Sequence, residues 1–85
     1  MAKILFESHG TGKRILKLLE SEKKYGGPQS IDDVCRNLGM TNRNTRSMLS
    51  TMTKNELIDR IGDGIYRIKG DSREFNKDKP HYGDE

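Results

Sequence analysis

Residues 30–55 decide the fold, and they read SIDDVCRNLGMTNRNTRSMLSTMTKN. Ser30 is a good N-cap, and the helix dipole favours the two carboxylates that follow it in the first turn. Gly39 fits the left-handed conformation in which many helices end. Thr41 then caps a further helix, which we expect to run to about Asn55. The stretch therefore predicts two helices joined by a tight turn.

The helix that begins after Thr41 has an apolar face and a polar face. Helical spacing predicts that the core-facing residues are Thr45, Leu49 and Met52, with Met48 alongside. The residues expected to face outward are Asn42, Arg43, Arg46, Ser47, Ser50 and Lys54. From Thr41 to Asn55 there are three basic residues and no acidic one. Because Ser, Thr and Asn are mediocre helix formers, we expect this composition to serve the exposed face.

Elements on both sides of this stretch complete the expected fold. Thr11 to Lys24 predicts an earlier helix, which the Tyr-Gly-Gly-Pro at 25–28 should end. Residues 57–61 and 65–69 predict two short strands around a Gly-Asp-Gly turn. The expected fold class is α+β and mainly helical, with three helices followed by a short β-hairpin. This order of elements is that of a winged helix-turn-helix.

The ends of the chain differ from its centre. We expect an N-terminal segment at 1–10, a winged-helix domain at 11–70 and a disordered acidic tail at 71–85. The tail carries only two apolar residues, Phe75 and Tyr82. Four further apolar residues either form a homodimer surface or cover the domain's own core, and the sequence leaves both roles open. These residues are Ile4, Leu5, Phe6 and Tyr66.

Composition limits the class of protein. A chain of 85 residues is one domain, with 31% hydrophobic and 34% charged residues and no apolar run of membrane-spanning length. The net charge is +3, divided into +5 over residues 1–70 and −2 over 71–85, which favours a polyanionic partner. The single cysteine, Cys35, excludes an internal disulfide framework. We therefore expect a cytoplasmic protein that is nucleoid-associated if it binds DNA.

Catalytic and metal-binding chemistry are not expected. His9 and His81 lie far apart without a ligand-spaced partner, so we predict no metal and no cofactor. Gly10 to Lys13 lacks both the first glycine and the Ser or Thr of a phosphate-binding P-loop. No nucleophile and base can be paired, and we expect that the protein is not an enzyme.

A family resemblance adds to this prediction. Residues 38–49, from Leu38-Gly39 through the Thr41 cap to Leu49, resemble bacterial and archaeal winged-helix regulators of the gluconate-repressor and multiple-antibiotic-resistance-regulator types. The resemblance covers residues 30–68. It implies recognition-helix contacts at Thr41, Asn42, Arg43, Arg46 and Ser47 and wing contacts at Arg60 and Arg67.

Two positions depart from the family pattern. Glu56 stands where the family usually has glycine, and we expect Asn55 to take the left-handed conformation in its place. The turn at 62–64 is very short and carries an acidic residue at its tip. We therefore expect DNA contact to depend on the third helix more than on the wing.

The predicted function is a transcription regulator that places its third helix in the major groove of double-stranded DNA. Arginine can bind guanine or phosphate there, and asparagine can pair with adenine. The candidate DNA-binding residues are Thr41, Asn42, Arg43, Asn44, Arg46, Ser47, Ser50, Lys54, Arg60 and Arg67. The alternative is a winged-helix module that binds another protein without direct DNA binding, through its apolar hairpin or N-terminal segment, with the tail as another possible binding segment. In that case the polar helix is only a solvated face.

Overall fold

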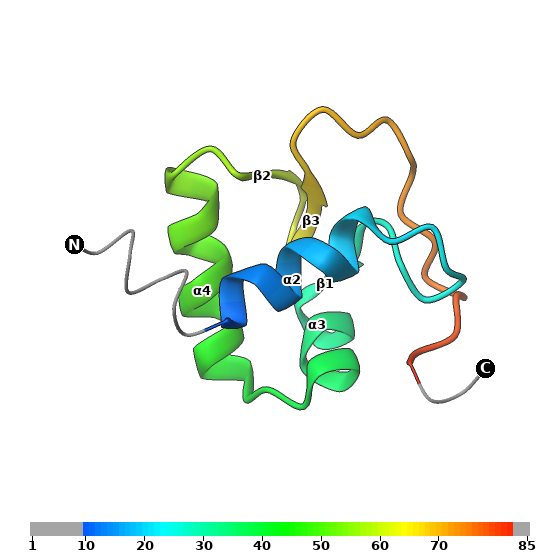
Figure 1. The fold of residues 1–85 in the computed structure, drawn as a ribbon, viewed down its shortest axis with the longest axis horizontal. Coiled ribbons are helices and arrows are strands. Elements are labelled where there is room, and N and C mark those ends of the chain that lie inside the picture. The colour runs from blue at the N-terminus through cyan, green and yellow to red at the C-terminus, as the bar shows by residue number, and fades with distance from the viewer. Residues whose placement is uncertain (1–9, 83–85) are drawn as a thin grey trace.

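The computed structural model describes residues 10–82, in which three helices lie against a three-stranded antiparallel sheet (Figure 1). The elements are α2 (Thr11–Glu20), β1 (Gln29–Ser30), α3 (Ile31–Leu38), α4 (Asn42–Lys54), β2 (Ile58–Gly62) and β3 (Ile65–Ile68). The strand order in the sheet is β1-β3-β2. The expected α+β class with three helices before the hairpin is confirmed for this part of the chain. The short strand β1, which pairs with β3 on the side away from β2, was not predicted.

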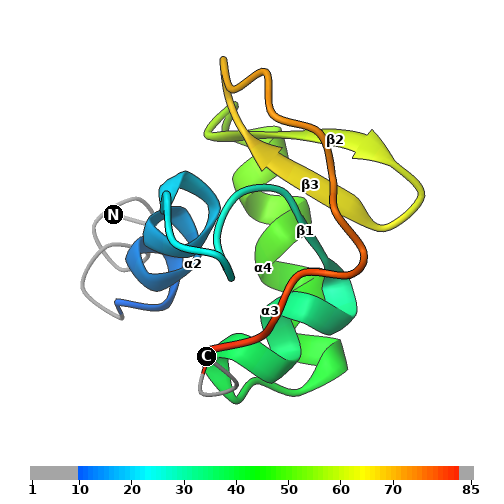
Figure 2. The same ribbon diagram turned by 90° about the vertical axis from the view of Figure 1, so that its right-hand side faces the viewer.

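The core lies where the helices meet the sheet. Its buried hydrophobic residues are Ile15, Leu18, Leu19, Val34, Leu49, Met52, Ile58 and Tyr66. α2 contacts β3, and α4 contacts both α3 and β2, so each long helix packs on a strand of the hairpin (Figure 2). The prediction that Thr45, Leu49 and Met52 face inward is confirmed, because all three are fully buried.

The turn between α3 and α4 follows the sequence signals closely. The Ser30 hydroxyl accepts a hydrogen bond from the Asp33 amide at 3.0 Å, and the Asp33 carboxylate accepts one from the Ser30 amide at 3.0 Å. Gly39 ends α3 with φ 66°, in the left-handed region that glycine adopts without strain. The Thr41 hydroxyl caps α4 by accepting from the amide of Asn44 at 3.2 Å. These predicted helix ends are confirmed.

α2 ends at Glu20, four residues before the predicted end at Lys24. The guanidinium of Arg73 donates to the main-chain oxygens of Leu19 at 2.9 Å and Ser21 at 2.7 Å, which satisfies carbonyls at the end of the helix. Gly26 folds back onto this end so tightly that an added Cβ would lie 2.4 Å from the Ser21 oxygen. A contact with a distant arginine therefore accompanies a helix end that the local sequence predicts four residues later.

The end of α4 also differs from the prediction. Asn55 has φ −86°, and Glu56 takes the left-handed conformation at φ 60°. The amide of Leu57 donates to the Met52 oxygen and the amide of Glu56 to the Thr53 oxygen, each at 3.0 Å. These two bonds form a Schellman motif, whose left-handed residue is the one directly before Leu57. The prediction for Asn55 was wrong because the hydrogen-bond pattern, and not residue preference, selects the position.

Residues 71–82 pack against the rest of the chain, and we call this segment the strap. Figure 2 shows it running from the end of β3 across the hairpin and down beside α3. Composition led us to expect a disordered tail at 71–85, and the described part differs from that expectation. The strap packs on the rest of the chain with few apolar residues because Arg73 and Lys79 both bind polar groups of the folded body.

Tyr66 does not fit the expectation that it belongs to a dimer surface. It is 9% exposed and belongs to the core, so it does not form the dimer surface that the sequence left open. For Tyr66 the other reading, coverage of the domain's own core, is correct. Ile4, Leu5 and Phe6, the rest of that set, lie outside the described residues.

Candidate nucleic-acid interface

The exposed side of α4 gathers most of the predicted DNA-binding residues. Eight candidates at and after the N-cap are exposed: Thr41, Asn42, Arg43, Asn44, Arg46, Ser47, Ser50 and Lys54. Successive helical residues are turned by about 100°, so Arg43, Ser47 and Lys54 lie most directly opposite the buried Thr45 and Leu49. Two arginines and a lysine therefore share an exposed surface with amide and hydroxyl groups, and no acidic residue of α4 interrupts them.

A hydrogen bond within this surface orients one arginine. The Nε of Arg46 donates to the side-chain oxygen of Asn42 at 2.7 Å, one helical turn away. A guanidinium group has five N–H donors, and this bond uses one of them. Arg46 is thereby held along the helix while its terminal nitrogens keep the forked geometry that suits guanine or phosphate. Asn42 positions Arg46 through its carbonyl, which was not predicted.

The two wing candidates lie in different surroundings from α4. Arg60 in β2 is exposed and pairs with Asp63 at the hairpin turn, with 3.3 Å between Nη2 and Oδ1. Arg67 in β3 is half-buried, and its Nη1 donates to the main-chain oxygen of Arg73 at 3.0 Å. The structure therefore holds Arg67 against the strap and Arg60 against an acidic partner. Among the described residues, neither arginine side chain forms a hydrogen bond or ion pair with a residue of α4.

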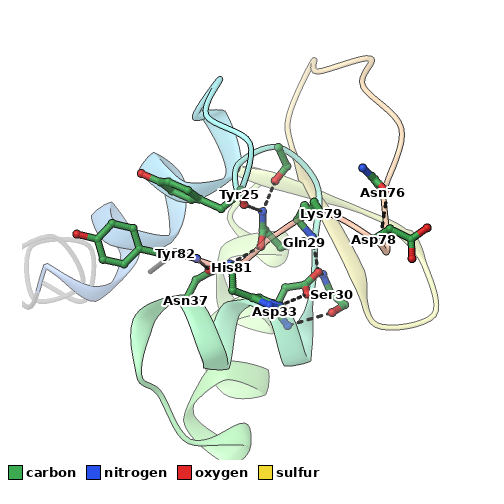
Figure 3. A network of polar contacts seen from close by, with 11 residues as sticks. Tyr25, Gln29, Ser30, Asp33, Asn37, Asn76, Asp78, Lys79, His81 and Tyr82 are labelled. Carbon is green, nitrogen blue, oxygen red and sulfur yellow. Dashed lines mark hydrogen bonds and ion pairs between the residues drawn. The ribbon is translucent and has the colours of Figure 1, made fainter. Parts of the chain in front are cut away.

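A polar network joins the strap to α3, and Figure 3 shows it from close by. Lys79 is almost fully buried, and its Nζ lies 2.6 Å from Oδ2 of Asp33. His81 places Nε2 2.9 Å from the other oxygen of the same carboxylate. The amide of Tyr82 donates to the side chain of Asn37, whose Nδ2 in turn donates to Gln29 at 3.0 Å. One carboxylate and one amide of α3 thus hold the end of the strap.

The electrostatics of Asp33 follow from these contacts. Burial alone would raise the pKa of the Asp33 carboxyl, but the hydrogen bonds from Lys79, the Ser30 amide and His81 outweigh it, so the pKa lies below the ordinary value. Asp33 is therefore held as a carboxylate that serves both the helix cap and the strap. Asp71 behaves similarly, because its hydrogen bonds from Arg73 outweigh desolvation and lower the pKa of its carboxyl.

Sequence reasoning missed this network. Ser30 and Asp33 were recognised as helix-starting residues, but nothing marked Asp33 as the partner of Lys79, which lies 46 positions away. The available signal was weak: a lysine and a histidine close together in a tail that also carries two aromatic residues. Within residues 10–82, no three His, Cys, Asp or Glu side chains come together as metal ligands.

Comparisons of the chain with protein-family models, curated proteins and solved structures give no match. The resemblance to winged-helix regulators therefore rests on the residues 38–49 quoted above. Over the part of the chain that the structure describes, no helix is both long enough and apolar enough to cross a membrane.

Proposed function

We propose that the chain is a winged helix-turn-helix protein that binds double-stranded DNA through α4 and acts as a transcription regulator. The observation that carries this proposal is the exposed side of α4, on which Arg43, Arg46 and Lys54 lie among amide and hydroxyl side chains without an acidic neighbour in the helix. Such a surface complements a polyanion. The order of α3, a tight turn, α4 and a hairpin supports the same class.

The dimensions of α4 suit a DNA groove. Its 13 residues span about 20 Å at 1.5 Å per residue, and a major groove about 12 Å wide admits one helix. Arg43 faces directly outward, and Arg46 is oriented by its bond to Asn42. In the proposed complex these two arginines bind guanine edges or phosphates. Asn44, Ser47 and Ser50 contribute further hydrogen bonds.

The position of the strap is consistent with this arrangement. Figure 1 shows α4 on one side of the molecule and the strap on the other, so the acidic residues at 71–82 do not cover the α4 surface. Arg60 and Arg67 add little to the proposal, because the first pairs with Asp63 and the second binds the strap.

The test is fluorescence-anisotropy binding to a mixed-sequence duplex across a salt series. The wild type is compared with the Arg43→Ala/Arg46→Ala double variant. Each phosphate contact contributes about 0.9 to the slope of log K against log salt, so losing two should reduce the slope by about two. At a specific site, once selected, Arg46→Ala should cost about 1–3 kcal/mol of binding free energy.

The matched control is Lys24→Ala/Lys77→Ala, which removes the same charge from two exposed positions outside α4. It should keep the slope close to that of the wild type. An equal loss of slope in both double variants would show that only net charge matters, and would contradict the placement of α4. No binding even at low salt would discard the DNA proposal in favour of the protein-interaction alternative, which a pull-down of partners would then address.

A further inference from the structure

An open pocket of about 400 Å³ lies between α2, the end of α3 and the strap. Its apolar part is formed by Leu18 and Leu38 together with the rings of Tyr25 and Tyr82. These rings meet edge to face, with centroids 5.3 Å apart and planes at 75°. Figure 3 shows both rings on the same side of the polar network that holds the strap. Tyr82 is 66% exposed, so the pocket offers an aromatic surface to a ligand.

The polar part of the same pocket is cationic. Arg14, Lys17 and Lys23 line it, and no Asp or Glu of the part of the chain that the structure describes does so. The Nη2 of Arg14 donates to the main-chain oxygen of Leu38 at 3.0 Å, which fixes the guanidinium at the edge of the pocket. Three cations beside two tyrosines favour a ligand that joins a multiply charged anion to a flat ring.

A second pocket shows why charge, and not volume, guides the assignment. It measures about 510 Å³ and lies beside α4, where residues such as Met40, Met48 and Thr51 line it. Among the described residues 10–82, no charged side chain lines it. Its described lining offers hydroxyl and amide groups but none of the cations that a phosphate favours.

We propose that the pocket between α2, α3 and the strap binds a phosphorylated nucleoside, either a free mononucleotide or the 5′-terminal nucleotide of a single strand. The base lies against Tyr82, and the phosphate lies among Lys17, Lys23 and Arg14. Base–aromatic stacking and a phosphate-binding cation cluster are the two contacts that such a ligand requires. The pocket volume falls within the ordinary range for small-molecule sites. The Tyr82 ring lines the pocket only while the strap is docked, because the Tyr82 amide donates to Asn37 of α3 in the docked strap.

The test is a nuclear magnetic resonance titration of the full chain with adenosine monophosphate, adenosine and inorganic phosphate in separate arms. We expect adenosine monophosphate to shift the amide signals of Leu18, Tyr25, Leu38 and Tyr82. Adenosine alone and inorganic phosphate alone should each bind at least about tenfold more weakly than adenosine monophosphate. Adenosine has no phosphate for the cations to bind, and inorganic phosphate has no base to stack on Tyr82. Equal affinity for adenosine monophosphate and inorganic phosphate, or shifts centred elsewhere, would overturn the proposal.

Variants separate the two contacts. Lys17→Gln should weaken binding about fivefold, whereas Lys13→Gln, an exposed position on the same helix outside the pocket, should leave it within about twofold. Tyr82→Ala should weaken binding by about five- to tenfold, and Tyr82→Phe, which keeps the ring, should bind as the wild type does. Equal effects of Lys13→Gln and Lys17→Gln, or a loss of binding in Tyr82→Phe, would contradict the assigned contacts.

A further arm uses a single-stranded tetranucleotide with a 5′-phosphate. Tighter binding of the tetranucleotide than of adenosine monophosphate assigns the site to a strand end, and weaker binding assigns it to a free nucleotide. None of these arms contains duplex DNA, and none of the variants alters α4. Failure of this proposal is therefore distinguishable from failure of the proposed duplex binding.

Discussion

Replacing Lys79 with Met should remove the main ionic contact that docks the strap. The Lys79 side chain is 4% exposed, and its Nζ lies 2.6 Å from the carboxylate of Asp33, which is 11% exposed. Removing one partner of a buried pair costs about 3–5 kcal/mol when the remaining charge has no other partner. Here the Ser30 amide and His81 still bind Asp33, which lowers the expected cost to about 2–4 kcal/mol of unfolding free energy. Met keeps an aliphatic side chain near the Phe75 ring, 4.8 Å from the original ammonium.

The assay is urea unfolding of the full chain at pH 7, followed by circular dichroism, with Lys77→Met as the matched control. Lys77 belongs to the strap but is exposed, so its replacement should stay within about 0.5 kcal/mol of the wild type. Hydrogen exchange should also show faster exchange at the Lys79 and Tyr82 amides in Lys79→Met, because both amides are bonded in the docked strap. Equal stabilities of the two lysine variants would refute the claim that this ion pair holds the strap.

Three further predictions follow from single residues. Because the folded-state pKa of Asp33 lies below the unfolded value of about 3.9, its contribution to stability is present above that pH and is lost as pH falls through the folded pKa. Urea unfolding from pH 7 to 3 should show this loss, and Asp33→Asn should lack it; an unchanged acid dependence in the variant would contradict the prediction. Glu56→Gly should raise the unfolding free energy by up to about 1 kcal/mol, because it relieves a left-handed residue, and a lower thermal midpoint would count against it. Gly26→Ala should lower the unfolding free energy by about 1–3 kcal/mol, because the new Cβ would clash with the Ser21 oxygen. An unchanged urea midpoint would show that the backbone at Gly26 does not lie so close to Ser21.

The local signals around the turn were sufficient to predict α3 and α4. Ser30, Gly39 and Thr41 each act on the backbone within a few residues of their own position, so their effect can be inferred from neighbouring sequence. The outward face of α4 was predictable for the same reason, because helical spacing fixes which residues oppose Thr45 and Leu49. Those signals predict which residues of α4 are exposed. That these exposed residues contact DNA is a further step, which belongs to the proposed function.

The remaining features depend on contacts between distant residues. Arg73 binds the Leu19 carbonyl, 54 positions away, and this contact accompanies the early end of α2. The two-residue strand β1 forms because Gln29 and Ser30 pair with Tyr66 and Ile65, although neither residue is a strong strand former. Composition predicted a disordered tail because it measures average apolar content, and it gave no weight to two cations that find specific acceptors in the folded body.

The structure assigns different tasks to the two groups of charged residues, and net charge alone conceals this division. Arg73 and Lys79 are bound within the protein by main-chain oxygens and by Asp33, so they stabilise the fold and are not offered to a partner. Arg43 and Lys54 lie exposed on α4, on the side of the molecule away from the strap (Figure 1). A polyanion that approaches α4 therefore meets a surface more cationic than the overall charge of +3 indicates. The three acidic residues of the strap are offset by its three basic ones and lie away from α4, so the proposed interface rests on the placement of charge and not on its sum.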